Sequence, residues 1–139
     1  MFNLHGTDRL TAWRDFRNKL ETSSTPLEDV ANLWSRAPFV SAFLNPKDPK
    51  TWPDPWHLVL DSRWDDLAIV LGMLYTIKLT DRFKDAQLDV KSFTAKDGSP
   101  QYILVVNNKH VLNLEYRCVI TVDEVPPVAT SLVYTTLDK

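Results

Sequence analysis

Cysteine, glycine and histidine are scarce in this chain of 139 residues. There is one cysteine, Cys118, and there are three glycines and three histidines. One thiol can form neither an internal disulfide nor a cysteine-based zinc site, so both are excluded. Three glycines and no glycine-rich motif exclude a phosphate-binding loop for a nucleotide. His5, His57 and His110 lack metal-ligand spacing, so we predict no metal and no cofactor.

An excess of charge and long apolar runs are also lacking. Sixteen basic and eighteen acidic side chains give a formal net charge of −2, without the basic footprint of a nucleic-acid-binding protein. No apolar run reaches the roughly 18 residues of a membrane-spanning helix. The first residues also lack the pattern of a signal peptide. We therefore expect a soluble, cytoplasmic protein that binds neither nucleic acid nor membrane and forms a single domain over residues 1–139.

The residues that are present divide the chain into a helical half, about 1–82, and a β half, about 86–137. All five tryptophans precede residue 65. The last predicted helix is apolar around most of its circumference, which is typical of a central buried helix. Apolar spacing predicts helices over residues 7–21, 26–37, 55–60 and 64–79.

Two local signals refine the helical half. Thr25, followed by Pro26 and Glu28, predicts an N-cap with a capping box at the second helix. Residues 45–56 hold four prolines and predict a rigid, ordered segment, because Trp52 and Trp56 would be costly to leave exposed.

The β half predicts an antiparallel sheet of four to five strands. Asp97-Gly98 and Asn107-Asn108 are typical turn residues between extended segments. Helices followed by antiparallel strands indicate an α+β fold, with the central helix packed on the sheet. The predicted strands cover residues 87–95, 101–106, 110–115, 117–122 and 129–136.

Single residues give little sign of catalysis. Cys118 lies in a strand-like run without a nearby helix start or histidine, so we predict a buried or half-buried, unreactive thiol. Asp65 and Asp66 are adjacent on a helix and point about 100° apart, which favours a role as helix-start charges over paired acid–base work. The tryptophans are predicted to serve the core, since no basic patch accompanies them.

One pattern nevertheless resembles a known family. The run Asp61-Ser62-Arg63-Trp64-Asp65-Asp66-Leu67-Ala68 is similar to the Gly-Asp-Cys-(Asp/Glu)-Asp-x-Ala signature of transglutaminase-like cysteine peptidases. Residues 101–106, 107–110 and 111–115 resemble the strand that carries the family's histidine, the turn, and the strand that carries its aspartate. Residues 51–56 are similar to the Trp-x-x-Pro segment of bacterial members. The resemblance covers nearly the whole chain and implies a transglutaminase-like fold.

The departures from the family pattern concern its catalytic residues. The resemblance puts Trp64 at the position of the nucleophilic cysteine, Gln101 at that of the histidine and Glu115 at that of the aspartate. Tryptophan is no nucleophile, and glutamine takes no proton at neutral pH. Losing one triad member typically costs several orders of magnitude in rate. The resemblance therefore implies a transglutaminase-like scaffold without its catalysis.

The leading hypothesis is a non-catalytic binding or structural protein with a protein partner. Its candidate binding residues are Trp52, Trp56 and Asp65. A separate, third interpretation is that exposed tryptophans form a protein-interaction patch. The oligomeric state is left open.

Two further interpretations remain. The alternative to the leading hypothesis is a hydrolase-type enzyme in which Asp65, Asp66, Glu115 and His110 meet in a remodelled cleft. In addition, the Trp-Pro-x-Pro-Trp segment and the Asp-Leu-Ala that follows it resemble small proteins of large tailed phages. That resemblance implies a phage component that is associated with the virion.

Overall fold

The computed structural model describes the chain except residues 41–43, 62, 116, 126–128 and 137–139. The described residues form helices first and strands afterwards, as the sequence predicts. The helices are α1 (Gly6–Leu20), α2 (Pro26–Trp34), α3 (Pro55–Val59) and α4 (Asp66–Lys78), with 3₁₀ turns η1 (Pro49–Thr51) and η2 (Val122–Glu124). The strands are β1 (Leu88–Thr94), β2 (Pro100–Val106), β3 (His110–Leu112), β4 (Val119–Thr121) and β5 (Ser131–Thr135).

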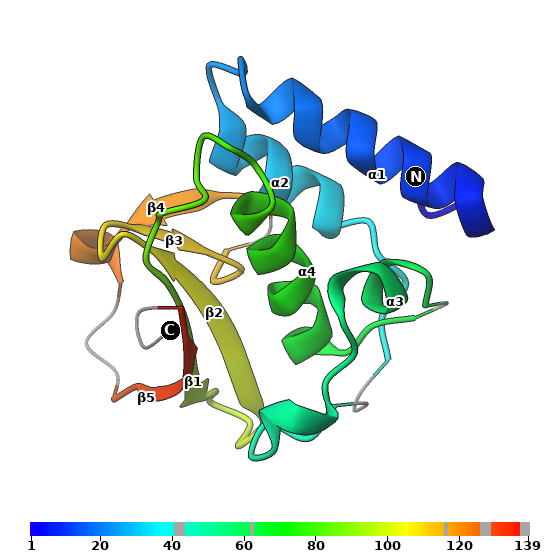
Figure 1. Cartoon of the computed structure of the whole chain (residues 1–139). Coiled ribbons are helices and arrows are strands. Elements are labelled where there is room, and N and C mark those ends of the chain that lie inside the picture. The colour runs from blue at the N-terminus through cyan, green and yellow to red at the C-terminus, as the bar shows by residue number, and fades with distance from the viewer. Residues whose placement is uncertain (41–43, 62, 116, 126–128, 137–139) are drawn as a thin grey trace.

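The five strands make one antiparallel sheet in the order β4-β3-β2-β1-β5. Helix α4 lies against β1 and β2 on one side and against α2 and α3 on the other, while α1 lies farther out and packs on α3 (Figure 1). Apart from Asp66, Tyr75 and the terminal Lys78, the residues of α4 are buried. The predicted α+β fold with a central buried helix is thereby confirmed.

Strand β2 separates two clusters of buried side chains. Tyr102, Leu104 and Val106 belong to the large core that contains α4. Ile103 and Val105 belong to a small cluster on the other face of the sheet. The alternation follows from the two-residue period of a strand, so each residue of β2 can be assigned to one face.

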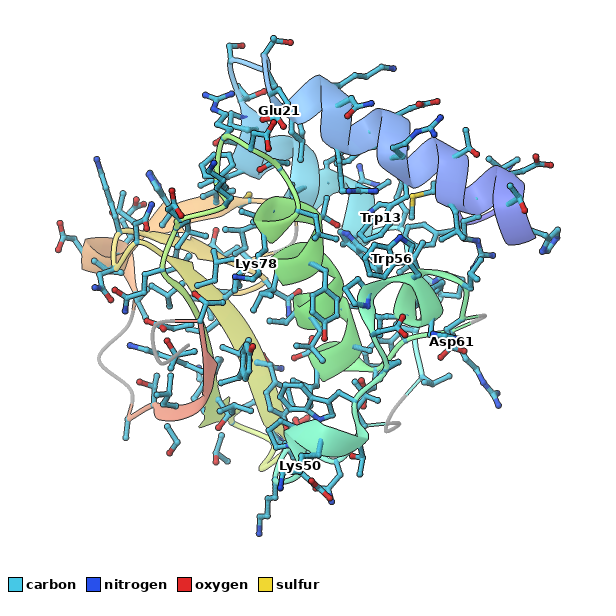
Figure 2. All side chains as sticks on the ribbon, viewed as in Figure 1. Trp13, Glu21, Lys50, Trp56, Asp61 and Lys78 are labelled. Carbon is cyan, nitrogen blue, oxygen red and sulfur yellow. The ribbon has the colours of Figure 1, made fainter. Side chains whose placement is uncertain are left out.

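Two buried tryptophans are tied to α4 through one hydroxyl. The indole Nε1 atoms of Trp13 and Trp34 each donate to Thr76 Oγ1 at 3.0 Å, and Thr76 donates to the Gly72 carbonyl. Figure 2 shows Trp13 extending from α1 into the interior. A Cβ at Gly72 would lie 2.4–2.6 Å from carbons of the Trp34 ring, so this position requires glycine. The core role predicted for the tryptophans is confirmed for these two and for Trp64, which is also fully buried.

The other predictions for tryptophans hold only in part. Trp52 is half-buried, and its indole donates to the Asn45 carbonyl at 2.7 Å. Trp56 has 48% of its surface exposed, so the expectation that both side chains of this segment are covered is wrong for Trp56.

The predicted helix starts are partly wrong. Helix α1 begins after His5, and no side chain caps it. Thr25 is the N-cap of α2, but its hydroxyl donates to Asp29 at 3.1 Å instead of forming the capping box predicted with Glu28. The Thr25 amide, which a capping box would pair with Glu28, donates to Ser23 Oγ at 3.1 Å instead.

The end of α4 is held by a carboxylate from the loop after α1. Glu21 accepts hydrogen bonds from the backbone amides of Asp81 and Arg82 at 2.8 and 2.9 Å, and Figure 2 shows it beside that turn. Arg82 in turn donates to the carbonyls of Leu20 and Ser23. In the part of the chain that the structure describes, no helix has the length and apolar character needed to cross a bilayer.

Candidate functional site

Trp64, the residue just before the N-cap of α4, is enclosed in the core. No solvent reaches its side chain, and its indole Nε1 donates to the Leu58 carbonyl at 2.9 Å. Its ring packs edge-on against Phe2 and Trp34, with ring centroids 4.9 and 5.9 Å apart. The backbone is fixed too, because the Trp64 amide donates to the Pro38 carbonyl at 2.9 Å. Trp64 thus fills the space at the start of α4.

A buried arginine holds the segment before Trp64 in place. The Arg9 guanidinium donates to the carbonyls of Val59 and Asp61 and to those of Phe2 and Leu4 in the N-terminal segment. It also lies 5.8 Å from the centroid of the Trp64 ring, within reach of a cation–π interaction. The loop that leads into α4 is therefore anchored from both its backbone and its aromatic side.

The two adjacent aspartates at the start of α4 serve different elements. Asp65 is the N-cap: Oδ1 accepts from the Ala68 amide at 2.8 Å, and Oδ2 accepts from the Leu44 amide at 2.9 Å. Asp66 turns toward the sheet and accepts from the Tyr102 amide at 2.8 Å. The predicted role as helix-start charges is correct.

Asp66 joins α4 to the sheet through a second contact. Asn113 Nδ2 donates to Asp66 and to the Tyr102 carbonyl, both at 2.9 Å. Asn113 follows β3 with φ 71°, a left-handed conformation that asparagine tolerates better than most residues. Burial raises the pKa of Asp66, and the nearby Asp65 adds to this, while the bonds from Asn113 and Tyr102 oppose it.

Two hollows border this network and meet at Phe39. The first, the apolar hollow, has a volume of about 250 Å³. The second, the acidic hollow, has a volume of about 470 Å³. Ala31, Trp34, Ser35, Phe39, Ile69, Met73, Asn113, Glu115 and Arg117 line the apolar hollow. Phe39, Leu44, Pro46, Asp65, Asp66, Leu67, Ser99, Pro100, Gln101 and Tyr102 line the acidic hollow.

The residues predicted from the family pattern are spread over this region. Gln101 borders the acidic hollow, but its cross-strand partner Phe93 packs in the small cluster, so its side chain belongs to the face away from α4. Glu115 is exposed and borders the apolar hollow. The residues that meet the start of α4 are Tyr102 and Asn113, which the sequence analysis missed. Because alternate residues of a strand share a face, the position of Leu104 would have indicated that Tyr102 faces α4.

The alternative acid–base set is not assembled. Asp65 and Asp66 line the acidic hollow, whereas Glu115 lines the apolar one. His110 begins β3 and pairs with Val106 and Thr121, and it borders neither hollow. Because Asn113, three residues farther along, is the residue that reaches Asp66, His110 lies at the other end of its strand, roughly 10 Å away by strand rise.

The single thiol lies at the surface of the molecule. Cys118 is exposed, which corrects the prediction of a buried or half-buried thiol, because the strand it was expected to occupy begins only at Val119. It borders neither hollow. Among the described residues, no group of three or more His, Cys, Asp or Glu side chains is placed to hold a metal ion.

Solved structures of one protein share this architecture. Calcium-bound LapG of Legionella pneumophila matches with a TM-score of 0.67 and 14% identity, over 96% of this chain and 77% of LapG. A second structure of Legionella pneumophila LapG gives a TM-score of 0.68 and 15% identity, over 99% of this chain and 80% of LapG. No protein-family model and no curated protein matches the sequence. At this identity the likeness shows the fold, and the chain has a transglutaminase-like α+β fold.

Proposed function

We propose that this chain is a non-catalytic transglutaminase-like domain that works by binding another protein. The burial of Trp64 is the observation that carries the proposal. By resemblance, this position corresponds to the family's nucleophilic cysteine. An indole that is bonded to the Leu58 carbonyl and closed to solvent offers no nucleophilic atom and no access for a substrate.

The surroundings of Trp64 support the same proposal. LapG is a transglutaminase-like cysteine protease, and the proposal is that this chain keeps such a fold without cysteine chemistry. Neither hollow is lined by a cysteine or a histidine in the part of the chain that the structure describes. Gln101 and Glu115 stay proposed as the residues at the histidine and aspartate positions, and glutamine cannot serve as a general base at neutral pH.

The binding residues predicted from the sequence remain part of the proposal. Trp56 exposes about half of its surface, and exposed tryptophans are frequent among the residues that dominate binding energy. Asp65 borders the acidic hollow. Trp52 packs edge-on against Tyr134, with ring centroids 5.8 Å apart, which supports the segment from which Trp56 projects.

An activity assay with matched variants tests the absence of catalysis. The purified chain and the variant Cys118→Ser are each incubated with peptide, amide and ester substrates. The substitution removes the chain's single thiol, which lies at an exposed position. We expect no turnover above buffer for either protein. Turnover that disappears in Cys118→Ser would contradict the proposal through cysteine chemistry. Turnover that survives it but disappears in Asp66→Asn would favour the carboxylate hydrolase instead.

Localisation belongs to the same proposal. We propose a cytoplasmic protein. The resemblance of the Trp-Pro-x-Pro-Trp segment at residues 52–56 to small phage proteins supports, for a phage source, a virion-associated component. Mass spectrometry of purified particles and of the host cell's soluble fraction tests this. Copies of the chain in the particle at a fixed ratio to the capsid protein support the virion assignment. Copies confined to the soluble fraction contradict it.

A further inference from the structure

Phe39 is the most exposed large apolar side chain among the described residues, at 62%. Its exposure is not the result of a loose backbone. Phe39 forms an isolated parallel bridge with Trp64, and the Val40 amide donates to the Trp64 carbonyl at 3.0 Å. An aromatic ring held out in solvent by a fixed backbone, between two hollows, is a suitable contact residue for a partner.

The size of the apolar hollow indicates what enters it. Its volume of about 250 Å³ lies below the roughly 300–1,000 Å³ of typical small-molecule pockets. Its walls include Trp34, Ile69 and Met73. A hollow of this size and lining suits one apolar side chain of a partner better than a separate ligand.

The acidic hollow indicates the chemistry of a second side chain on the same partner. Asp65 and Asp66 both border it. Asp65 is buried and accepts from the amides of Ala68 and Leu44, so Asp66 is the carboxylate that is partly open to this hollow. Within the described residues, no Lys, Arg or His side chain forms an ion pair with Asp66. The local charge is therefore complementary to a basic side chain.

The two hollows form one surface. They share Phe39, and Asn113 of the apolar hollow donates to Asp66 of the acidic one. We refer to the two hollows with Phe39 as the Phe39 groove. Side chains two residues apart on an extended segment project to the same side, roughly 7 Å apart. Because the two hollows share Phe39, a single extended segment that passes over this residue can present side chains to both hollows.

We propose that the Phe39 groove binds an extended segment of a partner protein that carries an apolar side chain and, two residues away, a lysine or arginine. The apolar side chain enters the hollow beside Trp34, and the cation lies against Asp66. This deepens the proposed function, on which it rests, by naming the chemistry of the partner.

Labelled peptides test the proposal on the full chain. Three nine-residue fluorescent peptides differ only in a central Leu-Ser-Lys, Leu-Ser-Glu or Ser-Ser-Lys, and anisotropy measures their binding. We expect the first to bind at least tenfold more tightly than the other two, with an affinity that falls as salt rises. Equal affinities for the Lys and Glu peptides, or an affinity independent of salt, would overturn the proposal.

Variants locate the binding. Phe39→Ala should lower the affinity for the Leu-Ser-Lys peptide at least tenfold. Asp66→Asn should reduce the difference in affinity between the Leu-Ser-Lys and Leu-Ser-Glu peptides. Thermal melts show whether each variant is folded. Leu79→Ala, an exposed apolar position at the far end of α4, is the matched control and should bind unchanged.

Two outcomes separate the failure of this inference from that of the proposed function. Loss of peptide binding in Trp56→Ala with normal binding in Phe39→Ala overturns the groove but leaves a non-catalytic binding protein. Thiol-dependent cleavage of the peptides overturns both.

Discussion

The two faces of the sheet differ in the size of the cluster of buried side chains that packs on them. Toward α4, β2 contributes Leu104 to a large core that includes three buried tryptophans. On the other face, Ile103 sits in a cluster of three buried residues with partly buried neighbours. These two residues are adjacent on one strand and have side chains with the same number of carbons, so a comparison of the two reports mainly on their surroundings. The comparison indicates that the α4 face holds most of the stability and that the candidate site lies at its rim.

Alanine substitutions on β2 test most directly whether the two faces contribute differently to stability. Leu104→Ala and Ile103→Ala remove the same number of carbons from neighbouring, buried positions. We expect a loss of about 4 kcal/mol in unfolding free energy for Leu104→Ala and about 2 kcal/mol for Ile103→Ala, because the small cluster can close over a cavity. Urea unfolding measures both. Equal losses would show that the two faces contribute alike.

Gly72→Ala tests how closely the α4 face is packed. The new methyl group would meet the Trp34 ring at 2.4–2.6 Å, and that ring is held by Thr76 and its aromatic neighbours. We expect a loss of about 3 kcal/mol. Gly98→Ala is the control: it lies in open space with φ 85°, so it should cost only about 1–2 kcal/mol through the left-handed backbone. A smaller loss at Gly72 than at Gly98 in thermal unfolding would contradict the close packing.

The Thr76 hydroxyl is the common acceptor of the indole N–H groups of Trp13 and Trp34. Thr76→Val keeps the shape of the side chain but removes this acceptor, so it should lower the unfolding free energy by about 2 kcal/mol. Thr76→Ser, which keeps the hydroxyl, should cost less than half as much. The measurement is chemical denaturation followed by tryptophan fluorescence. If Thr76→Ser cost as much as Thr76→Val, the shared oxygen would matter no more than the methyl group that serine lacks.

The smallest expected effect is the contribution of Asp66 to the pH dependence of the unfolding free energy. Because burial raises its pKa above the ordinary 3.8, the folded chain binds this proton more tightly than the unfolded chain does. The Asp66 contribution to unfolding free energy therefore falls as pH rises from about 3.8 through the raised value and is constant above it. Relative to wild type, Asp66→Asn should gain stability across that window. Urea titrations between pH 3 and 7 measure the difference, and a relative loss as pH rises would contradict the assignment.

Most of the fold could be predicted because its elements carry local signals. The apolar circumference of residues 64–79 predicted the buried helix, and the Asp97-Gly98 turn predicted the hairpin of β1 and β2. The capping box at Thr25 failed because the Thr25 amide donates to Ser23 Oγ and the Thr25 hydroxyl donates to Asp29, which leaves Glu28 without the amide that it would have bonded. The exposure of Trp56 depends on what covers α3, which no local pattern encodes.

The candidate site was predicted less well, for a geometric reason. A one-residue shift along β2 changes the face of the sheet, so the resemblance alone could not distinguish Gln101 from Tyr102. Asn113 reaches Asp66 because its backbone is left-handed just after β3. Phe39 is positioned by a single parallel bridge to Trp64, a pairing between residues distant in sequence that periodicity does not reveal.

The contact between Gly72 and Trp34 also has a consequence for variation among related chains. The two positions are 38 residues apart in the sequence, yet the space that one side chain takes is lost to the other. A relative with alanine or serine at position 72 should therefore carry a smaller residue at position 34, and one with tryptophan at 34 should keep glycine. Each substitution alone meets a barrier, so the pair is expected to change together or to stay.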